Sequence, residues 1–335
     1  MLIKLRSLLP TALALVALAA CTAPQGTVAP SAATQVEPTE VLSTPTLAAP
    51  TDTPLPSETP TPEISPTPET PVRFAVIGDY GHGGPDEFAV AELIDSWLVD
   101  FIVTTGDNNY PDGEAETIDD NIGQFYHRYI GNYQGEYNRG SAENRFFPSL
   151  GNHDWNPGNI DAYLDYFDLP GNERYYDVVQ GEVHLFILDS DTNEPDGVGR
   201  SSDQAAWLQD ALAGSTTAWQ VVVFHHPAYS SGYHTSTEWM QWPFSDWGVD
   251  AVLSGHDHLY ERLEVDGLLY ITNGLGGHEA IYEFGKILPE SMFRYNDLHG
   301  AMLVEATSIW VRFDFYNVEG GLVDSYTLTL LEANP

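Results

Sequence analysis

The segment Gly78-Asp79-Tyr80-Gly81 follows directly after the apolar run 72–77, and similar segments recur along the chain. A glycine-containing turn after a buried strand can aim a polar side chain into a cleft at the end of that strand. Carboxylate, amide, phenol and imidazole groups in such turns are the donors that a pair of transition-metal ions needs. Four more segments complete the pattern: Gly106-Asp107-Asn108-Asn109-Tyr110, Gly151-Asn152-His153-Asp154, Val222-Val223-Phe224-His225 and Gly255-His256-Asp257-His258.

The five segments resemble the motifs of the calcineurin-like metallophosphoesterases and, within them, of the purple acid phosphatases. The family pattern is GDxG, GDxxY, GNH(D/E), VxxH and GHxH, and this chain matches all five in order. Tyr110 is the residue that best distinguishes the purple acid phosphatase pattern from that of other metallophosphoesterases. Many other metallophosphoesterases carry a histidine two residues after the first aspartate, where this chain has Gly81. The resemblance covers most of the region from about residue 72 to residue 331.

The resemblance implies two metal sites that share one carboxylate. One site would use Asp79, Asp107, Tyr110 and His258, and the other would use Asp107, Asn152, His225 and His256. The first set is richer in anionic oxygen, which suits a trivalent ion, whereas imidazole and amide ligands suit a divalent ion. We therefore predict Fe(III) in the first site and Fe(II), Zn(II) or Mn(II) in the second. Coordination to Fe(III) would keep Tyr110 ionised.

Three further residues are candidate catalytic groups. His153 follows Asn152 and cannot easily serve the same metal, so we expect it to contact phosphate oxygens or to protonate the leaving group. Asp154 would orient His153 through a hydrogen bond. The family places a substrate-facing histidine in the region of His234.

Other histidines are given no ligand role. His226 precedes Pro227 and is expected to point away from the metals. His82 and His278 lie near glycines and could line the cleft, but they are interpreted as ordinary loop histidines.

The ligand set and His153 predict a metal-dependent phosphoric monoester hydrolase, acid phosphatase-like, that uses in-line attack by a metal-bound hydroxide. The first alternative is a phosphodiesterase of the same superfamily acting on nucleotides or lipid headgroups, because the motifs do not report whether a second ester group fits. The second alternative is a non-catalytic metal- or phosphate-binding lipoprotein, although such a protein has no need for a leaving-group acid. The expected substrate is a phosphorylated small molecule.

The charge balance limits the possible partners. The 335 residues include 49 acidic and 12 basic side chains, for a formal net charge of −37. Nucleic acids and anionic lipids require clustered lysine and arginine, so a nucleic-acid scaffold role is excluded. The same charge repels phosphorylated substrates unless metal ions reverse the local field. We interpret the acidic surface as solubilising, and it does not indicate an oligomeric state.

The first 71 residues are predicted to lie outside the fold. Residues 1–21 form a lipoprotein-type signal peptide: Lys4 and Arg6 precede an apolar stretch that ends in Leu18-Ala19-Ala20-Cys21, which resembles a bacterial lipobox. Cys21, the only cysteine, would carry the lipid that anchors the protein to a bacterial membrane outside the cytoplasm. Residues 22–71 form a Pro/Thr-rich linker too poor in apolar side chains to fold. Residues 72–335 form the catalytic domain.

The catalytic domain is predicted to belong to the α/β class. Strand-like runs occur at 72–77, 101–103, 183–188, 219–224, 251–253, 268–272, 301–304, 309–316 and 326–331. Helical patterns begin at Pro85, with Phe88, Ala91, Ile94 and Leu98 on one face, and near Ser202; further ones lie near 117–129 and 160–167. Helix-covered sheets with ligands at strand ends fit a two-sheet sandwich. The resemblance implies the same α/β/β/α layout of two mixed sheets flanked by helices.

Overall fold

The structure, a computed structural model, describes residues 69–330. The predicted signal peptide with Cys21, and the predicted linker as far as residue 68, lie outside these residues. At Glu69, the first of these residues, the carboxylate accepts hydrogen bonds from Ser308 N and Oγ at 3.0 and 2.7 Å. None of the helices within residues 69–330 is long and apolar enough to cross a membrane.

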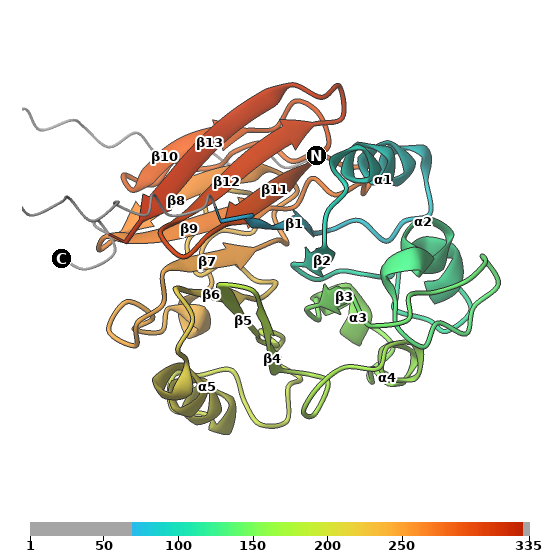
Figure 1. The fold of residues 1–335 in the computed structure, drawn as a ribbon, viewed down its shortest axis with the longest axis horizontal. Coiled ribbons are helices and arrows are strands. Elements are labelled where there is room, and N and C mark those ends of the chain that lie inside the picture. Colours follow the sequence, from blue (N-terminus) through green and yellow to red (C-terminus); the bar gives the residue numbers. More distant parts are fainter. Residues whose placement is uncertain (1–68, 331–335) are drawn as a thin grey trace, which may run out of the picture. The chain divides into compact units, whose positions relative to one another are not determined.

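One mixed sheet of six strands has the order β13-β12-β11-β1-β2-β3 (Figure 1). Neighbours among β1, β2 and β3 run parallel, whereas β11 pairs antiparallel with both β1 and β12. In this register Val76 lies opposite Val103 on one side and Met302 on the other. The strands are β1 Val72–Ile77, β2 Phe101–Thr104, β3 Phe146–Pro148, β11 Gly300–Ala306, β12 Trp310–Asn317 and β13 Leu322–Thr329.

A second mixed sheet of seven strands has the order β10-β8-β9-β7-β6-β5-β4. Its central strands β5, β6, β7 and β9 pair in parallel, and the antiparallel strands lie toward its two edges. The strands are β4 Tyr176–Gln180, β5 Val183–Ile187, β6 Trp219–Val223, β7 Ala251–Ser254, β8 Tyr260–Val265, β9 Leu268–Asn273 and β10 Ser291–Tyr295.

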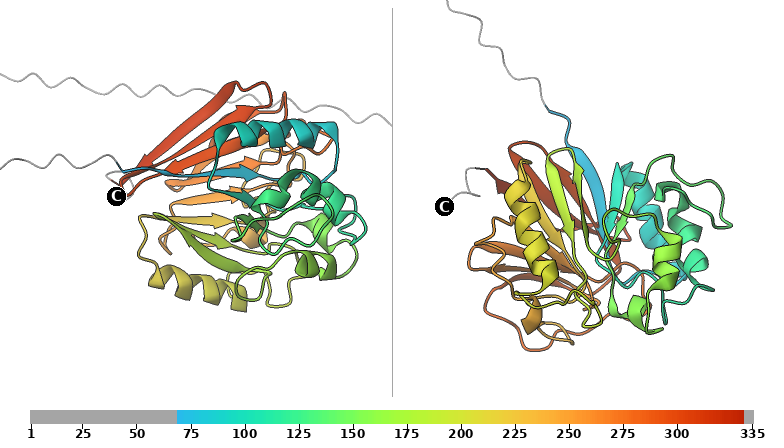
Figure 2. Two further views of the ribbon diagram at one scale, coloured as in Figure 1. Left: turned by 45° about the vertical axis from the view of Figure 1, so that its right-hand side comes forward. Right: turned by 90° about the horizontal axis from the view of Figure 1, so that it is seen from below.

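Both faces of the second sheet are buried, which explains its continuous apolar strands. Side chains alternate across a strand, so Val221 and Val223 enter the core that the two sheets share. Val222 and Phe224 enter a separate core beneath helix α5 (Asp203–Gly214), which contributes Leu208 to it. This alternation makes the fold a layered sandwich, and the views in Figure 2 show the two sheets side by side with helices outside them.

Short helices complete the layers. Helix α1 (Pro85–Trp97) packs beside β11, and α5 begins after Ser202, whose Oγ accepts a hydrogen bond from Ala205 N at 3.1 Å. The remaining helical segments are η1 Asp119–Gly123, α2 Gln124–Tyr126, η2 His127–Tyr129, α3 Asn152–Trp155, α4 Asp161–Tyr166 and η3 Glu238–Met240.

The predicted α/β/β/α sandwich of two mixed sheets is confirmed, but the face predicted for α1 is only half buried, with Ala91 and Ile94 inside. Phe88 and Leu98 are 53% and 82% exposed. The helix also buries Glu87, Val90 and Leu93, and Leu98 ends it in a left-handed conformation with φ 55°. Four strands were not predicted, because they are short or lie near sheet edges where apolar periodicity is weak: β3, β4, β8 and β10.

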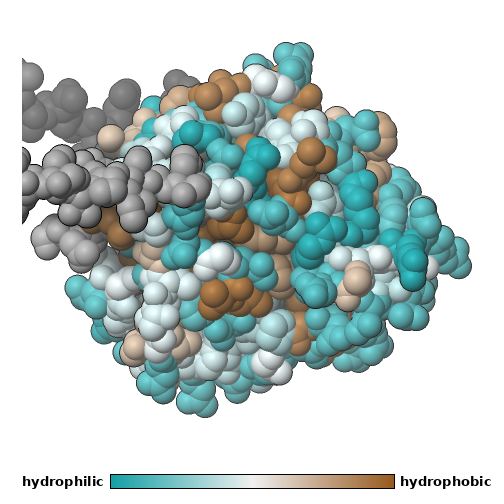
Figure 3. All heavy atoms as spheres, viewed as in Figure 1, coloured by the Kyte–Doolittle hydropathy of each residue, from teal (hydrophilic) through white to brown (hydrophobic). Residues whose placement is uncertain are grey.

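Most residues on the surface in Figure 3 are hydrophilic or of intermediate hydropathy, and the hydrophobic residues lie in small groups. This view agrees with the excess of acidic residues in the composition. The visible face has no broad apolar area of the kind that large protein interfaces use.

Candidate metal centre

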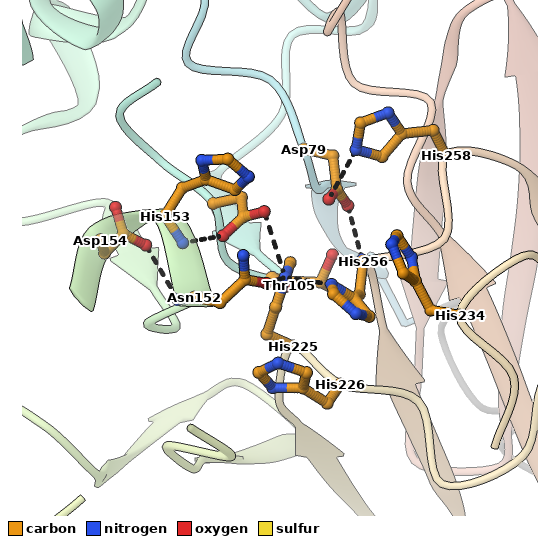
Figure 4. A network of polar contacts seen from close by, with 12 residues as sticks. Asp79, Thr105, Asn152, His153, Asp154, His225, His226, His234, His256 and His258 are labelled. Carbon is orange, nitrogen blue, oxygen red and sulfur yellow. Dashed lines mark hydrogen bonds and ion pairs between the residues drawn. The ribbon is translucent and has the colours of Figure 1, made fainter. Parts of the chain in front are cut away.

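The five sequence segments lie at the carboxyl ends of five strands. Asp79 follows β1, Asp107 follows β2, Asn152 follows β3, His225 follows β6 and His256 follows β7. Because β1, β2 and β3 are parallel in one sheet, and β6 and β7 are parallel in the other, their ends meet in one place. In Figure 4 the side chains of Asp79, Asn152, His225 and His256, which come from separate loops, lie close together.

One group of four donor atoms gathers around the Tyr110 hydroxyl. Tyr110 Oη lies 3.3 Å from Asp79 Oδ1, 3.0 Å from Asp107 Oδ2 and 3.3 Å from His258 Nε2. His258 Nε2 also lies 3.3 Å from Asp79 Oδ1. Ligands bound about 2.1 Å from one ion lie roughly 3 to 3.4 Å apart, so the spacing of this group fits a single metal ion.

A second group of donor atoms gathers around His225 Nε2. This nitrogen lies 3.1 Å from Asn152 Oδ1, 3.2 Å from Asp107 Oδ2 and 3.1 Å from His256 Nδ1. Asp107 Oδ2 therefore belongs to both groups. The structure divides the seven predicted ligands into the two sets that the family resemblance implied, while metal binding itself remains a prediction.

Backbone carbonyls orient two of the imidazoles. His225 Nδ1 lies 2.8 Å from Thr105 O, and His258 Nδ1 lies 2.8 Å from Ala280 O. A carbonyl only accepts hydrogen bonds, so Nδ1 carries the proton in each neutral ring and Nε2 keeps its lone pair for a ligand role. Both Nε2 atoms face the centre of their donor group.

The backbone of the site is held in conformations that side chains rarely adopt. Asp79, Asp107 and His256 have positive φ angles of 57°, 51° and 68°. Such residues cost free energy and collect at functional sites, where surrounding contacts enforce them. The motif glycines permit close approach: a Cβ at Gly151 would overlap the Asp107 carboxylate, and a Cβ at Gly255 would lie 2.6 Å from Asp79 Oδ2. The glycines are therefore required because each one packs against a predicted ligand from another segment.

Charges within the cluster shift its protonation equilibria. Burial alone would raise the pKa of Asp107, but the adjoining His225 holds that pKa well below its usual range. Burial opposes protonation of His225, yet Asp107 raises the pKa of His225 to about 10. Burial and the charges of Asp107 and Asp79 raise the pKa of Tyr110 well above its ordinary value. A cation bound here would displace these protons, so we expect metal affinity to weaken as the pH falls.

His153 lies beside the donor groups without joining either of them. Its ring centroid is 4.4 Å from that of Tyr110, its Nδ1 lies 2.5 Å from Pro111 O, and its backbone N–H donates to Asp107 Oδ1 at 2.9 Å. The side chain is partly exposed, so it can reach a ligand in the cleft.

Asp154 does not orient His153, which corrects the prediction from the sequence. The buried Asp154 carboxylate accepts hydrogen bonds from Gly151 N at 2.8 Å and from Asn108 Nδ2 at 2.8 Å. It therefore fixes the turn that carries Asn152 and the loop that follows Asp107. The prediction failed because Asp154 and His153 are adjacent on the short helix α3, and adjacent helical side chains do not face each other.

A carboxylate–histidine contact exists instead at His234. His234 Nδ1 lies 3.2 Å from Asp257 Oδ1, and the His234 ring stacks on His256 with centroids 4.0 Å apart. His234, the predicted substrate-facing histidine, thus lies directly beside the second donor group. Asp257 was missed because it is the variable position of the GHxH motif, where the pattern attaches no meaning to the residue type.

Two histidines lie nearer to the site than predicted. His226 is buried, with its ring 4.5 Å from His256 and its Nδ1 2.9 Å from Ser190 Oγ, so it does not point away. The ring of His278 is 4.4 Å from both Tyr110 and His258. Its position beside two predicted ligands agrees with the cleft-lining alternative and not with an ordinary loop histidine.

Known proteins are similar to this chain in sequence and in fold. Residues 72–260 match the family model of the calcineurin-like phosphoesterases. Purple acid phosphatase 17 of Arabidopsis thaliana is 27% identical over 290 residues, which cover 76% of this chain and 83% of the relative. Fe(3+)-Zn(2+) purple acid phosphatase 12 of the same plant is 26% identical over 223 residues, covering 61% of this chain and 46% of the relative. Purple acid phosphatase PPD1 of yellow lupin seeds shares the fold, with a TM-score of 0.64, 17% identity, and coverage of 79% of this chain and 55% of PPD1.

Proposed function

Because the chain belongs to the calcineurin-like phosphoesterase family and is purple acid phosphatase-like within it, we propose that it hydrolyses phosphate monoesters outside the cytoplasm. The convergence of two donor groups on Asp107, beside the two partly exposed histidines His153 and His234, is the observation that carries this proposal. A site that only stored metal would have no use for uncoordinated imidazoles at its edge.

The two donor groups would hold a trivalent and a divalent ion. Asp79, Tyr110 and His258 would bind the Fe(III), Asn152, His225 and His256 would bind the divalent ion, and Asp107 would bridge them. The ions, when bound, supply Lewis acidity that activates water and neutralises charge on the phosphoryl oxygens. The backbone carbonyls of Thr105 and Ala280 orient two of these ligands, His225 and His258.

His153 and His234 would act on the substrate. No lysine or arginine contacts the two donor groups within residues 69–330, so neutral groups and imidazoles, His153 and His234 among them, would be the donors to phosphate oxygens. His153 would donate a hydrogen bond to the phosphate or a proton to the departing oxygen. The contact of its Nδ1 with Pro111 O leaves Nε2 as the ring nitrogen available for either role, and Nε2 can donate only when both ring nitrogens are protonated.

The preference for monoesters is tested by comparing hydrolysis of an aryl phosphate monoester with that of the matching diester. The full chain is supplied with iron plus zinc or manganese, and kcat/KM is measured for both esters. We expect the monoester to be preferred. A preference for the diester would instead support a phosphodiesterase acting on nucleotides or lipid headgroups. Phosphate binding without hydrolysis of either ester would support the non-catalytic binding lipoprotein.

The Fe(III) assignment predicts a visible colour that depends on Tyr110. A phenolate bound to Fe(III) should give a charge-transfer absorption band, and Tyr110→Phe should abolish this band while leaving the fold intact. The fold should survive because the Phe side chain retains the Tyr110 ring and its packing. Absorption spectra and iron content of both proteins, loaded in parallel, provide the measurement. An unmutated protein that carries full Fe(III) yet is colourless would contradict the assignment.

The location outside the cytoplasm rests on Cys21, which lies before the described residues. Lipidation of Cys21 would anchor the domain through the predicted 22–71 linker, whose upper reach is on the order of 150 Å if it is fully extended. Cys21→Ser should therefore move the protein from the membrane fraction to the soluble fraction of a bacterial expression host. Mass measurement of the mature N-terminus provides the second readout. Membrane retention of the unlipidated variant would contradict this anchor.

A further inference from the structure

The loop 230–234 is wrapped around the buried carboxylate of Asp257. Asp257 Oδ2 accepts a hydrogen bond from Ser230 Oγ at 2.5 Å, and Asp257 Oδ1 accepts one from His234 N at 2.9 Å. Ser230 Oγ in turn accepts from Gly232 N at 2.9 Å. Asp257 is 0% exposed, and these donors replace the water that a buried carboxylate loses.

The packing at this carboxylate leaves the loop little freedom. A Cβ at Gly232 would overlap the Asp257 carboxylate, so only glycine permits the chain to pass so close. The loop is also held from its other side, because Ser231 N donates to Glu261 Oε2 at 2.7 Å. Two buried carboxylates therefore hold this loop, but only Asp257 also contacts an imidazole of the site.

The contact with Asp257 determines how His234 is placed. With Nδ1 directed at Asp257 Oδ1, 3.2 Å away, the ring nitrogen left for a ligand is Nε2. The ring is confined by stacking on His256, and the rings of Tyr233 and Tyr282 lie 5.1 and 5.5 Å away. The His234 side chain remains 32% exposed, so a ligand can reach it.

We propose that Asp257 is a positioning residue, which holds His234 beside the metal centre with Nε2 free to contact an oxygen of the bound phosphate group. This inference rests on the proposed function, since it assigns His234 a contact with the phosphate of the substrate. Asp257 lies between His256 and His258 in the chain, so one turn would supply two metal ligands and also the anchor of the histidine that faces the substrate.

A double-mutant cycle tests the proposal on the metal-loaded full chain. The variants are Asp257→Asn, His234→Ala and the two combined, with Glu261→Gln as a matched control for the other buried carboxylate under the loop. The readouts are kcat/KM for an aryl phosphate, the affinity for inorganic phosphate by calorimetry, and metal content. Phosphate affinity is independent of turnover, so a protein that binds phosphate and hydrolyses no ester would refute the proposed function, while the phosphate affinities of the variants would still decide this inference.

We expect Asp257→Asn to weaken phosphate affinity and kcat/KM by roughly 10-fold to 100-fold, as is usual for a residue that orients a functional histidine. In the His234→Ala background the same change should have no further effect, and metal content should stay at the unmutated level. Losses that multiply in the double mutant would overturn the proposal. Loss of metal in Asp257→Asn, or an equal loss in Glu261→Gln, would also overturn it, because each indicates a role independent of His234.

Discussion

Replacing Asp107 with asparagine is expected to remove metal from both positions and to lower hydrolysis by about 10³-fold or more, if the bridging carboxylate supplies at least ~4 kcal/mol of transition-state stabilisation. Asp107 Oδ1 accepts a hydrogen bond from His153 N, while Oδ2 faces both Tyr110 Oη and His225 Nε2. An asparagine cannot satisfy both sides. Its amide nitrogen must face either the His153 N–H, which is also a donor, or the metals, which it cannot bind.

Metal content by elemental analysis and kcat/KM are measured together for Asp107→Asn. A suitable control is Asp250→Asn, which makes the same chemical change at a carboxylate that accepts from Gln220 N at 2.8 Å. The control should retain its metals and its activity. Two ions per chain in Asp107→Asn, or activity near that of the unmutated protein, would refute the bridging role of Asp107.

Removing the His153 imidazole is expected to lower kcat by about 10²-fold to 10⁴-fold while metal content stays unchanged. The imidazole packs on Tyr110 and contacts Pro111 O, but it belongs to neither donor group. In His153→Ala the backbone N–H that donates to Asp107 Oδ1 remains, so the ligands should keep their positions. The measurement is kcat for an aryl phosphate, whose leaving group departs easily, and for an alkyl phosphate, whose leaving group needs a proton.

The comparison of the two esters separates the two roles considered for His153. A larger loss for the alkyl ester would identify His153 as the acid that protonates the leaving group, and an equal loss would assign it to the phosphoryl oxygens. His127→Ala is the control, because His127 Nδ1 contacts Gly123 O and His127 lies in none of the five motifs. Loss of metal in His153→Ala, or a change in kcat of less than about threefold, would contradict both roles.

Much of the architecture could be predicted from the sequence, because it depends on local patterns. The apolar runs of β1, β2, β5, β6 and β7 are strands buried on both faces, and such strands remain apolar without alternation. The prediction of buried residues failed in part on α1, where burial depends on a neighbouring strand. On α1, the apolar spacing of Phe88 and Leu98 suggested a buried face, but the position of β11 beside the helix decides which side is covered.

The candidate site, too, could be predicted from the sequence only in part. The five motifs and the family resemblance that they carry were sufficient to predict all seven residues of the two donor groups, and parallel strands of one sheet bring the ends that carry these motifs together. The motifs contain no information on which carboxylate contacts which histidine. Asp154 is next to His153 in the chain yet holds Asn108 and Gly151, and Asp257 holds His234 from another loop.

The sequence by itself determined the family resemblance, the layered sheets and the set of donor side chains, since each depends on short segments whose spacing is visible in one dimension. The tertiary structure alone decided the placement of His226 and His278 beside the site and the pairing of Asp257 with His234. These contacts join loops from separate strands, and their distances follow from how the two sheets pack and from the close approaches that Gly151, Gly232 and Gly255 permit.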